Sequence, residues 1–158
     1  MSSMKKAFID ANAFIYFLSD IKEKAEHVQK ILEDENYELY TSYAVLNEVK
    51  FRLLINKAIE ELKTTKKHRL IKFISDNENI RISIIEKYIK FFINIASFVT
   101  ILDMNEMTEK ATCSIIIKNG LLPTDASIVA LMMSNNIKKI LTSDSDFKKI
   151  KGIEVIVI

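Results

Sequence analysis

Residues 139–147, Lys-Ile-Leu-Thr-Ser-Asp-Ser-Asp-Phe, combine a short apolar run with two carboxylates that follow it directly. The run over 139–142 predicts a buried β-strand, and Asp144 and Asp146 come just after its end. The same arrangement occurs near the N-terminus, where Ala7-Phe8-Ile9 is followed by Asp10. Because ligands of parallel α/β sheets bind beyond the carboxyl ends of the strands, both positions are candidates for a functional site.

The rest of the chain alternates between strand and helix signals, which predicts an α/β fold with a parallel sheet covered by helices on both faces. About five strands are expected, at 7–9, 38–41, 98–102, 139–142 and 154–157. Helices are expected at 11–18, 21–34, 43–56, 58–77, 84–96, 105–118 and 125–134. Thr41 or Ser42 is expected to cap the third of these helices, and Thr124 the last. The length of 158 residues fits a single domain over 1–158, in which about 58–96 forms extra helices.

Composition excludes several classes of site. A single cysteine permits neither an intramolecular disulfide nor a thiolate zinc cage, and two histidines cannot form a multi-histidine metal site. Two glycines exclude a Gly-rich dinucleotide-binding loop, and a net charge of +2 does not by itself indicate nucleic-acid binding. The longest apolar segment, 89–102, is shorter than the roughly 20 residues that span a membrane. We therefore expect a cytoplasmic protein with no membrane partner.

Two further acidic residues fall at the same predicted edge of the sheet as Asp10 and Asp144. Glu48 lies early in the helix that follows the second strand, and Asp125 opens a later helix. Carboxylates gathered in one place repel each other unless cations lie between them, and oxygen ligands without His or Cys select Mg²⁺ or Mn²⁺. Each acid alone also fits a simpler role, since Asp after a strand commonly caps a turn or helix. The joint pattern favours a metal site, and the otherwise basic chain suits a polyanionic substrate.

Four motifs in this order resemble the PIN-domain family of metal-dependent nucleases. They are Phe8-Ile9-Asp10-Ala11-Asn12, Thr41 to Glu48, Pro123-Thr124-Asp125 with the apolar helix after it, and Thr142-Ser143-Asp144-Ser145-Asp146-Phe147. The resemblance implies a three-layer α/β/α fold and an acidic quartet of Asp10, Glu48, Asp125 and Asp144 that holds one or two Mg²⁺ or Mn²⁺ ions. It implies that Asp146 assists the metal site. It also implies that Asn12, Thr142 and Ser143 support the ligands or contact phosphate.

The resemblance also implies hydrolysis of RNA, and it makes an antitoxin protein a candidate partner, since many small members are toxins of VapBC-type toxin–antitoxin pairs. The segment between Glu48 and Asp125 is longer than in compact toxin members, so a housekeeping RNA-processing nuclease stays open as an alternative. A non-catalytic RNA-binding or scaffold protein on the same fold is a second alternative. A phosphatase with a nucleophilic Asp10 would need a second Asp where Asn12 stands.

Two other clusters have both a structural and a functional interpretation. Basic residues gather at Lys63, Lys66, Lys67, His68 and Arg69, and they form either a solvated helix face or a contact for the RNA backbone. Apolar residues gather at Phe91, Phe92, Ile95 and Phe98. This second cluster predicts core packing or a surface for a homodimer or antitoxin.

Overall fold

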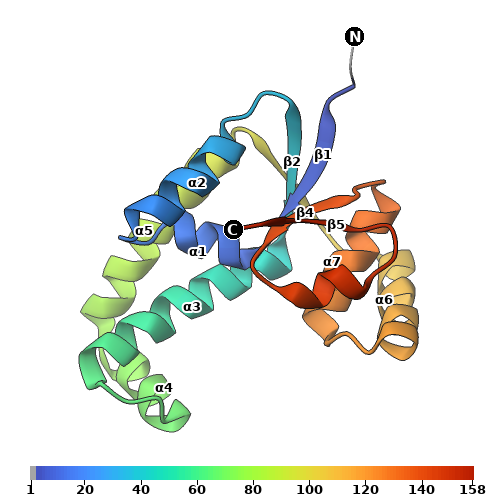
Figure 1. Cartoon of the computed structure of the whole chain (residues 1–158). Coiled ribbons are helices and arrows are strands. Elements are labelled where there is room, and N and C mark those ends of the chain that lie inside the picture. The colour runs from blue at the N-terminus through green and yellow to red at the C-terminus, as the bar shows by residue number, and fades with distance from the viewer. Residues whose placement is uncertain (1–2) are drawn as a thin grey trace.

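Five parallel strands form one sheet in the computed structural model, which describes residues 3–158 (Figure 1). The strands are β1 (Lys5–Ile9), β2 (Tyr37–Ser42), β3 (Val99–Leu102), β4 (Lys139–Thr142) and β5 (Glu154–Val157). The helices are α1 (Ala11–Phe17), α2 (Lys22–Leu32), α3 (Tyr43–Leu62), α4 (Lys67–Asp76), α5 (Glu78–Ile95), α6 (Glu106–Asn119) and α7 (Pro123–Ser134), with a 3₁₀-helix η1 (Ser145–Lys149). The predicted α/β class with about five parallel strands is confirmed.

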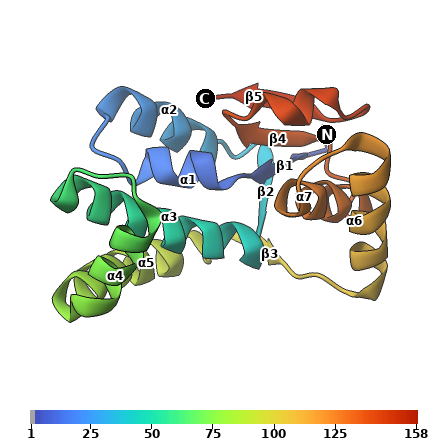
Figure 2. The ribbon, with the colours of Figure 1, turned by 90° about the horizontal axis from the view of Figure 1, so that it is seen from below.

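The sheet separates two layers of helices. Viewed along the strands, α1, α2, α3 and α5 lie on one face, and α6 and α7 lie on the other (Figure 2). Phe8 and Ile9 of β1 and Ile140 of β4 are fully buried in the sheet. Continuous apolar runs of this kind are typical of parallel strands that helices cover on both sides.

Helix ends follow from local chemistry, with one correction to the sequence prediction. The Ser42 hydroxyl accepts the Val45 N–H and caps α3, and Gly120 ends α6 with φ of 68°. Thr124 was expected to cap a helix starting at residue 125, but α7 begins two residues earlier, at Pro123, with Leu122 as the cap. Proline favours the first helical position because its fixed φ suits a helix and its missing N–H would be unpaired there.

Helices α3, α4 and α5 form an arm that extends away from the sheet, with α4 at its far end (Figure 1). The sequence predicted separate helices at 43–56 and 58–77, but α3 continues without interruption to Leu62. No glycine or proline interrupts it, and the break comes where Lys63 adopts a left-handed φ of 50°. Phe91 and Ile95 anchor α5 in the core as predicted, whereas Phe98 is 44% exposed.

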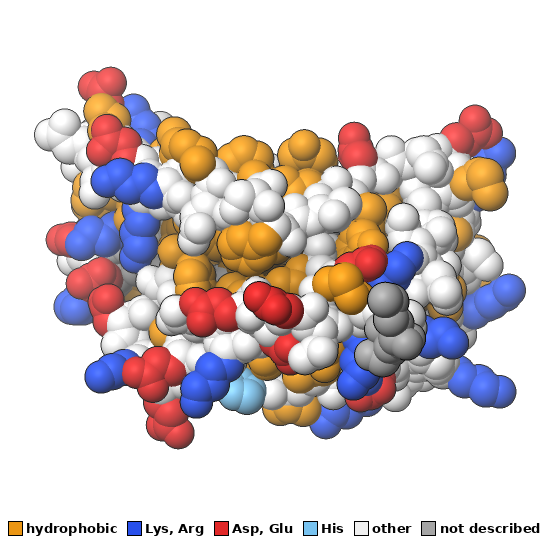
Figure 3. Space-filling model, turned by 90° about the horizontal axis from the view of Figure 1, so that it is seen from above, with side chains coloured by type: hydrophobic (Ala, Val, Ile, Leu, Met, Phe, Trp, Pro, Cys, Tyr) orange, Lys and Arg blue, Asp and Glu red, His pale blue; other side chains and the backbone are white. Residues whose placement is uncertain are grey.

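The strand order β3-β2-β1-β4-β5 reverses direction between β1 and β4. Ile9 pairs with Leu141 at the carboxyl end of this pair, so the loops after β1 and β4 leave the sheet side by side. At the opposite end, where the strands begin, acidic and basic side chains surround an apolar area (Figure 3). In open α/β sheets, the reversal point is the usual position of a ligand site.

Within residues 3–158, no single helix is long and apolar enough to cross a membrane. Helices α6 and α7 meet that test only as a pair, and they are bent by 118° where they join.

Candidate active site

Asp10 and Asp144 stand at the carboxyl ends of the two central strands. The Asp10 N–H continues the sheet by donating to the Leu141 carbonyl at 3.1 Å. Asp10 also caps α1, because its Oδ1 accepts the Ala11 N–H at 2.7 Å. Asp144 caps η1 by accepting the Asp146 N–H at 2.8 Å. Each carboxylate is therefore fixed by the backbone and keeps a second oxygen for other contacts.

Thr142 connects these two carboxylates. Its buried hydroxyl donates to Asp10 Oδ2 at 2.6 Å and accepts the Asp144 N–H at 3.0 Å. The Asn12 amide lies 3.4 Å from the same Asp10 oxygen. One hydroxyl on β4 thus sets the orientation of a carboxylate after β1 and of the backbone of the loop after β4.

Helix α3 contributes an acidic and a basic side chain to the same place. Glu48 and Arg52 are one turn apart on α3, with Arg52 Nη1 3.8 Å from Glu48 Oε1. Arg52 also donates to Asn12 Oδ1 at 2.6 Å. The guanidinium therefore joins α3 to the hydrogen-bond network around Asp10, and its charge partly offsets that of the acids.

Helix α7 directs Asp125 toward the same cleft from the other side of the sheet. Asp125 lies in the first turn of α7, where a negative charge is favoured by the helix dipole. A cleft of about 720 Å³ is lined by Glu48, Arg52, Asp125 and Asp144. The cleft therefore lies between α3 and α7, which cover opposite faces of the sheet (Figure 2).

Burial and mutual repulsion raise the pKa of three of these carboxyls. Burial is the largest cause for each of them. The pKa of Asp125 rises to about 6, with further contributions from the charges of Asp144, Asp10 and Glu48. The charge of Asp144 also raises the pKa of Asp10 and of Glu48, while Arg52 lowers both. These mutual effects demonstrate that the four acids share one electrostatic environment.

The donor set of this cluster fits a hard divalent cation. It consists of carboxylate oxygens with a hydroxyl and an amide behind them, which is the ligand chemistry of Mg²⁺ or Mn²⁺. An added positive charge would relieve the repulsion that raises the pKa values. As the side chains stand, no three His, Cys, Asp or Glu residues within 3–158 are grouped closely enough to hold a metal ion together. The fit therefore rests on donor chemistry and shared charge.

Residues 7–153 match the family described as "PIN domain". The chain belongs to the PIN domain family. It is 31% identical over 156 residues to "Ribonuclease VapC2" of Methanocaldococcus jannaschii. The aligned residues cover 96% of this chain and 93% of that protein. It is also 31% identical over 159 residues to "Ribonuclease VapC6" of the same organism, covering 98% of each chain. VapBC2 from Rickettsia felis, solved bound to a DNA fragment from their promoter, has a TM-score of 0.61 at 14% identity, covering 96% of this chain and 98% of that one.

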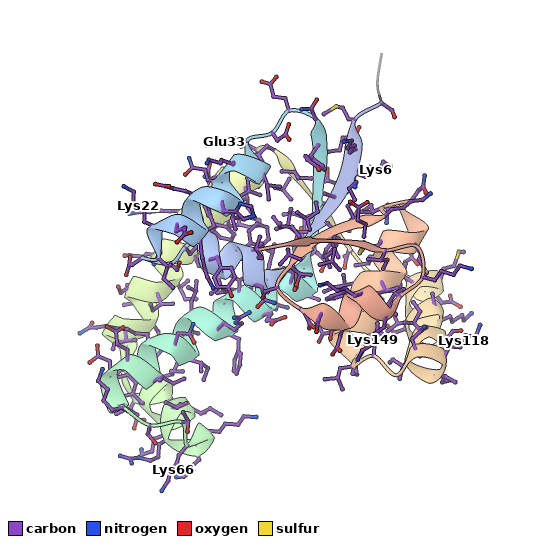
Figure 4. The ribbon with its side chains drawn as sticks, viewed as in Figure 1. Lys6, Lys22, Glu33, Lys66, Lys118 and Lys149 are labelled. Carbon is purple, nitrogen blue, oxygen red and sulfur yellow. The ribbon has the colours of Figure 1, made fainter. Side chains whose placement is uncertain are left out.

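The structure places Glu48, Asp125 and Asp144 along one cleft of this PIN domain and buries Asp10 within reach of their charges, but it leaves the basic cluster elsewhere. Asp146 lies at the periphery, where its Oδ1 accepts from Lys149 Nζ at 2.6 Å, although its charge still contributes to the raised pKa of Asp125. Ser143 is exposed beside the cleft loop. Lys63, Lys66, Lys67, His68 and Arg69 are all exposed around the start of α4. Figure 4 shows Lys66 at the free end of the arm, far from Lys149.

Sequence reasoning missed Arg52 in this PIN domain. Its spacing of four residues after Glu48 on a predicted helix was an available signal, since such pairs share one helix face. Its contact with Asn12 joins residues 40 positions apart and depends on how α3 packs against α1. Tyr16 packs partly against the core, and hydrogen bonds from Lys24 and Ser143 lower its pKa.

The raised pKa of Asp125 predicts a stabilising substitution in the metal-free PIN domain. A carboxyl whose pKa rises from its usual 3.8 in the unfolded chain to about 6 in the folded one contributes stability below about pH 4 that is lost as the pH rises through 6. Asp125→Asn removes the charge and should raise the free energy of unfolding near neutral pH by about 1 kcal/mol, allowing for solvent screening of a half-exposed group. Urea unfolding in EDTA at about pH 3.5 and about pH 7 measures it.

The effect should be large at about pH 7, about half as large at about pH 5 and small near about pH 3.5, because only below about pH 4 is Asp125 protonated in both the folded and the unfolded state. Asp103→Asn is the control, since Asp103 is an exposed carboxylate after β3 that accepts only the neighbouring Met104 N–H. Equal stability of Asp125→Asn and wild type at both pH values would contradict the electrostatic account.

Proposed function

We propose that this PIN domain is a divalent-metal-dependent ribonuclease that hydrolyses RNA phosphodiester bonds and acts as the toxin of a toxin–antitoxin pair. The observation that carries the proposal is the sharing of one charge environment by Asp10, Glu48, Asp125 and Asp144 at the reversal point of the sheet. Like charges placed together destabilise the metal-free fold, so the arrangement is best accounted for by a cation that binds there.

Each acid has a distinct task in this proposal. Asp10 and Asp144 are the ligands that the backbone holds in place, while Glu48 and Asp125 approach from α3 and α7. Asp146 assists from the periphery by fixing the loop after β4. Together they would hold one or two Mg²⁺ or Mn²⁺ ions.

Behind these acids, polar side chains maintain orientation. Thr142 donates to Asp10, and Asn12 connects Asp10 to Arg52. Ser143 is exposed at the loop and is available to contact phosphate. Residues behind metal ligands commonly change metal affinity or activity by 10–100-fold when replaced.

Bound divalent ions in such sites lower the pKa of a coordinated water and stabilise the charge that develops on the leaving oxygen. The carboxylates of this chain orient the scissile phosphate indirectly, by fixing where positive charge is concentrated in the cleft. Neither histidine lies among the cleft residues, so proton transfer in the proposal does not require an imidazole.

RNA as substrate and an antitoxin as partner rest on relatives. VapC2 and VapC6 are ribonucleases by name and align over nearly the whole chain. The VapBC2 neighbour shares the fold. The exposed basic residues Lys63, Lys66, Lys67 and Arg69 at the arm are candidates for contacting RNA phosphates away from the cleft.

A metal titration tests the proposal. Cleavage of single-stranded RNA should be lost in EDTA and should return with Mg²⁺ or Mn²⁺. Mn²⁺ should also raise the unfolding temperature, since a ligand at about 100 times its Kd stabilises the folded state by about 2.7 kcal/mol. A non-catalytic RNA-binding protein would bind RNA without cleaving it. Cleavage that persists in EDTA, or no thermal response to Mn²⁺ at millimolar concentration, would contradict the proposal.

A further inference from the structure

The cleft has an apolar component that the acidic cluster does not explain. Phe51 is 53% exposed and Leu122 is 73% exposed, and both line the cleft beside Glu48 and Asp125. The core phenylalanines Phe8, Phe14 and Phe147 are fully buried, so packing does not account for an exposed ring at this place. Large apolar side chains exposed next to charged groups commonly mark a binding site.

The two apolar side chains come from the elements that supply the acids. Phe51 lies three residues after Glu48 on α3, and therefore on the same helix face. Leu122 lies three residues before Asp125 and caps α7, with its carbonyl accepting the Ala126 N–H at 2.9 Å. Because α3 and α7 cover opposite faces of the sheet, Phe51 and Leu122 belong to opposite walls of the cleft.

We infer that Phe51 is a stacking surface for one unpaired base of single-stranded RNA, with Leu122 on the opposite wall. The inference rests on the proposed function, since it places the phosphate next to that base at the carboxylate cluster. A π-face stacks on any base, which gives affinity without demanding one sequence. A base inside a duplex already uses both faces for stacking, so the surface selects unpaired RNA.

Size favours a base over a protein partner. A stable protein interface buries about 800 Å² on each partner, far more than two side chains provide. A cleft of about 720 Å³ falls within the range of about 300–1,000 Å³ for small-molecule sites, which suits a nucleotide. Asn47 and Thr124 also line the cleft and are exposed, so their polar groups are available to the edge of a stacked base.

Tryptophan fluorescence tests the stacking directly, because the chain contains no tryptophan. Phe51→Trp places the only indole at the cleft. Phe98→Trp is the matched control, since Phe98 is 44% exposed but directly precedes β3 at the opposite end of the sheet.

Both tryptophan variants are made together with Asp10→Asn to prevent cleavage. They are titrated in Mg²⁺ with oligoadenylate of about 12 nucleotides, a length that covers typical single-strand site sizes. The same strand paired with oligouridylate is the duplex probe, and fluorescence anisotropy of labelled RNA reports binding separately.

Stacking predicts that the single strand quenches the indole fluorescence of Phe51→Trp and that the duplex quenches it far less. The fluorescence of Phe98→Trp should be unaffected by either RNA. In the same Asp10→Asn background, Phe51→Ala should weaken binding of the single strand by roughly 5- to 150-fold, as for other bases stacked on aromatic side chains. Phe51→Tyr should retain affinity, because it keeps the π-face.

The remaining outcomes separate the two proposals. Anisotropy could show binding while the indole of Phe51→Trp is not quenched, or is quenched equally by the duplex. Stacking on Phe51 is then wrong, and the apolar side chains of the cleft are instead assigned to contact with a protein partner. The ribonuclease proposal then stands on its own metal and cleavage tests. If neither RNA binds to the Asp10→Asn variants at any concentration tested, this inference is overturned, while RNA as substrate is decided by the cleavage test on the chain that keeps Asp10.

Discussion

Asp10→Asn is expected to lower metal-dependent RNA cleavage by more than about 100-fold, since replacing residues behind metal ligands already costs about 10–100-fold. The substitution removes one negative charge from the centre of the carboxylate cluster but keeps the size of the side chain. Asparagine Oδ1 can still accept the Ala11 N–H that caps α1. The Thr142 hydroxyl can turn to accept from the new amide in place of its weak 3.5 Å contact with the Asn12 amide, while it still accepts the Asp144 N–H.

The fold should therefore survive Asp10→Asn, and circular dichroism with urea unfolding would confirm it. Asp144→Asn is expected to have a similar effect on cleavage. Asp103→Asn serves as the matched control, because Asp103 also follows a strand and also accepts the N–H of the next residue, at 2.8 Å. Wild-type cleavage rates in both Asp10→Asn and Asp144→Asn would contradict the assignment of the acidic quartet.

Thr142→Val is expected to weaken Mn²⁺ binding by about 10–100-fold, although Thr142 is not itself proposed as a ligand. The change leaves Asp10 Oδ2 without its 2.6 Å donor and the Asp144 N–H without its acceptor. The lost hydrogen bond normally lowers the pKa of Asp10, so the valine variant should hold a proton more readily at the position that binds metal. Stability should fall by about 1–3 kcal/mol, the usual cost of unpaired buried polar groups.

Calorimetric titration with Mn²⁺ measures the affinity, and Thr142→Ser should restore it by restoring the hydroxyl. Thr112→Val is the control for loss of a buried threonine hydroxyl, since Thr112 is buried in α6 and donates only to the Thr108 carbonyl. It should reduce stability without changing Mn²⁺ affinity. An unchanged affinity in Thr142→Val would show that Asp10 does not depend on Thr142 for its orientation.

The parts of the fold that the sequence predicted well are those governed by local patterns. Apolar runs that end at Asp10 and shortly before Asp144 identified β1 and β4, because a strand buried on both faces needs continuous apolar residues. The convergence of the acids followed from treating the strands as parallel, and the structure adds that β1 and β4 are direct neighbours, with Ile9 paired to Leu141. The roles of these acids in metal binding stay predictions.

The parts that the sequence did not predict depend on contacts between distant residues or on competing local signals. Arg52 reaches Asn12 only because α3 packs beside α1. Thr124 is a favoured capping residue, but Pro123 before it fits the first helical turn and moved the start of α7. The unbroken course of α3 follows from the absence of glycine and proline between 43 and 62, a signal that the predicted break after residue 56 overlooked, and α4 and α5 pack against it.

The position of β1 at the centre of the sheet has a consequence for how the protein is made. β1 leaves the ribosome before β4, yet one of the two edges of β1 is completed by β4, which is synthesised more than a hundred residues later. Until then Asp10 lacks the Thr142 hydroxyl that donates a hydrogen bond to it, and Asp125 lacks the nearby charge of Asp144. The cleft between α3 and α7 also lacks the loop after β4 that completes its lining. A growing chain therefore cannot assemble the acidic cluster until β4 and the loop after it have been synthesised.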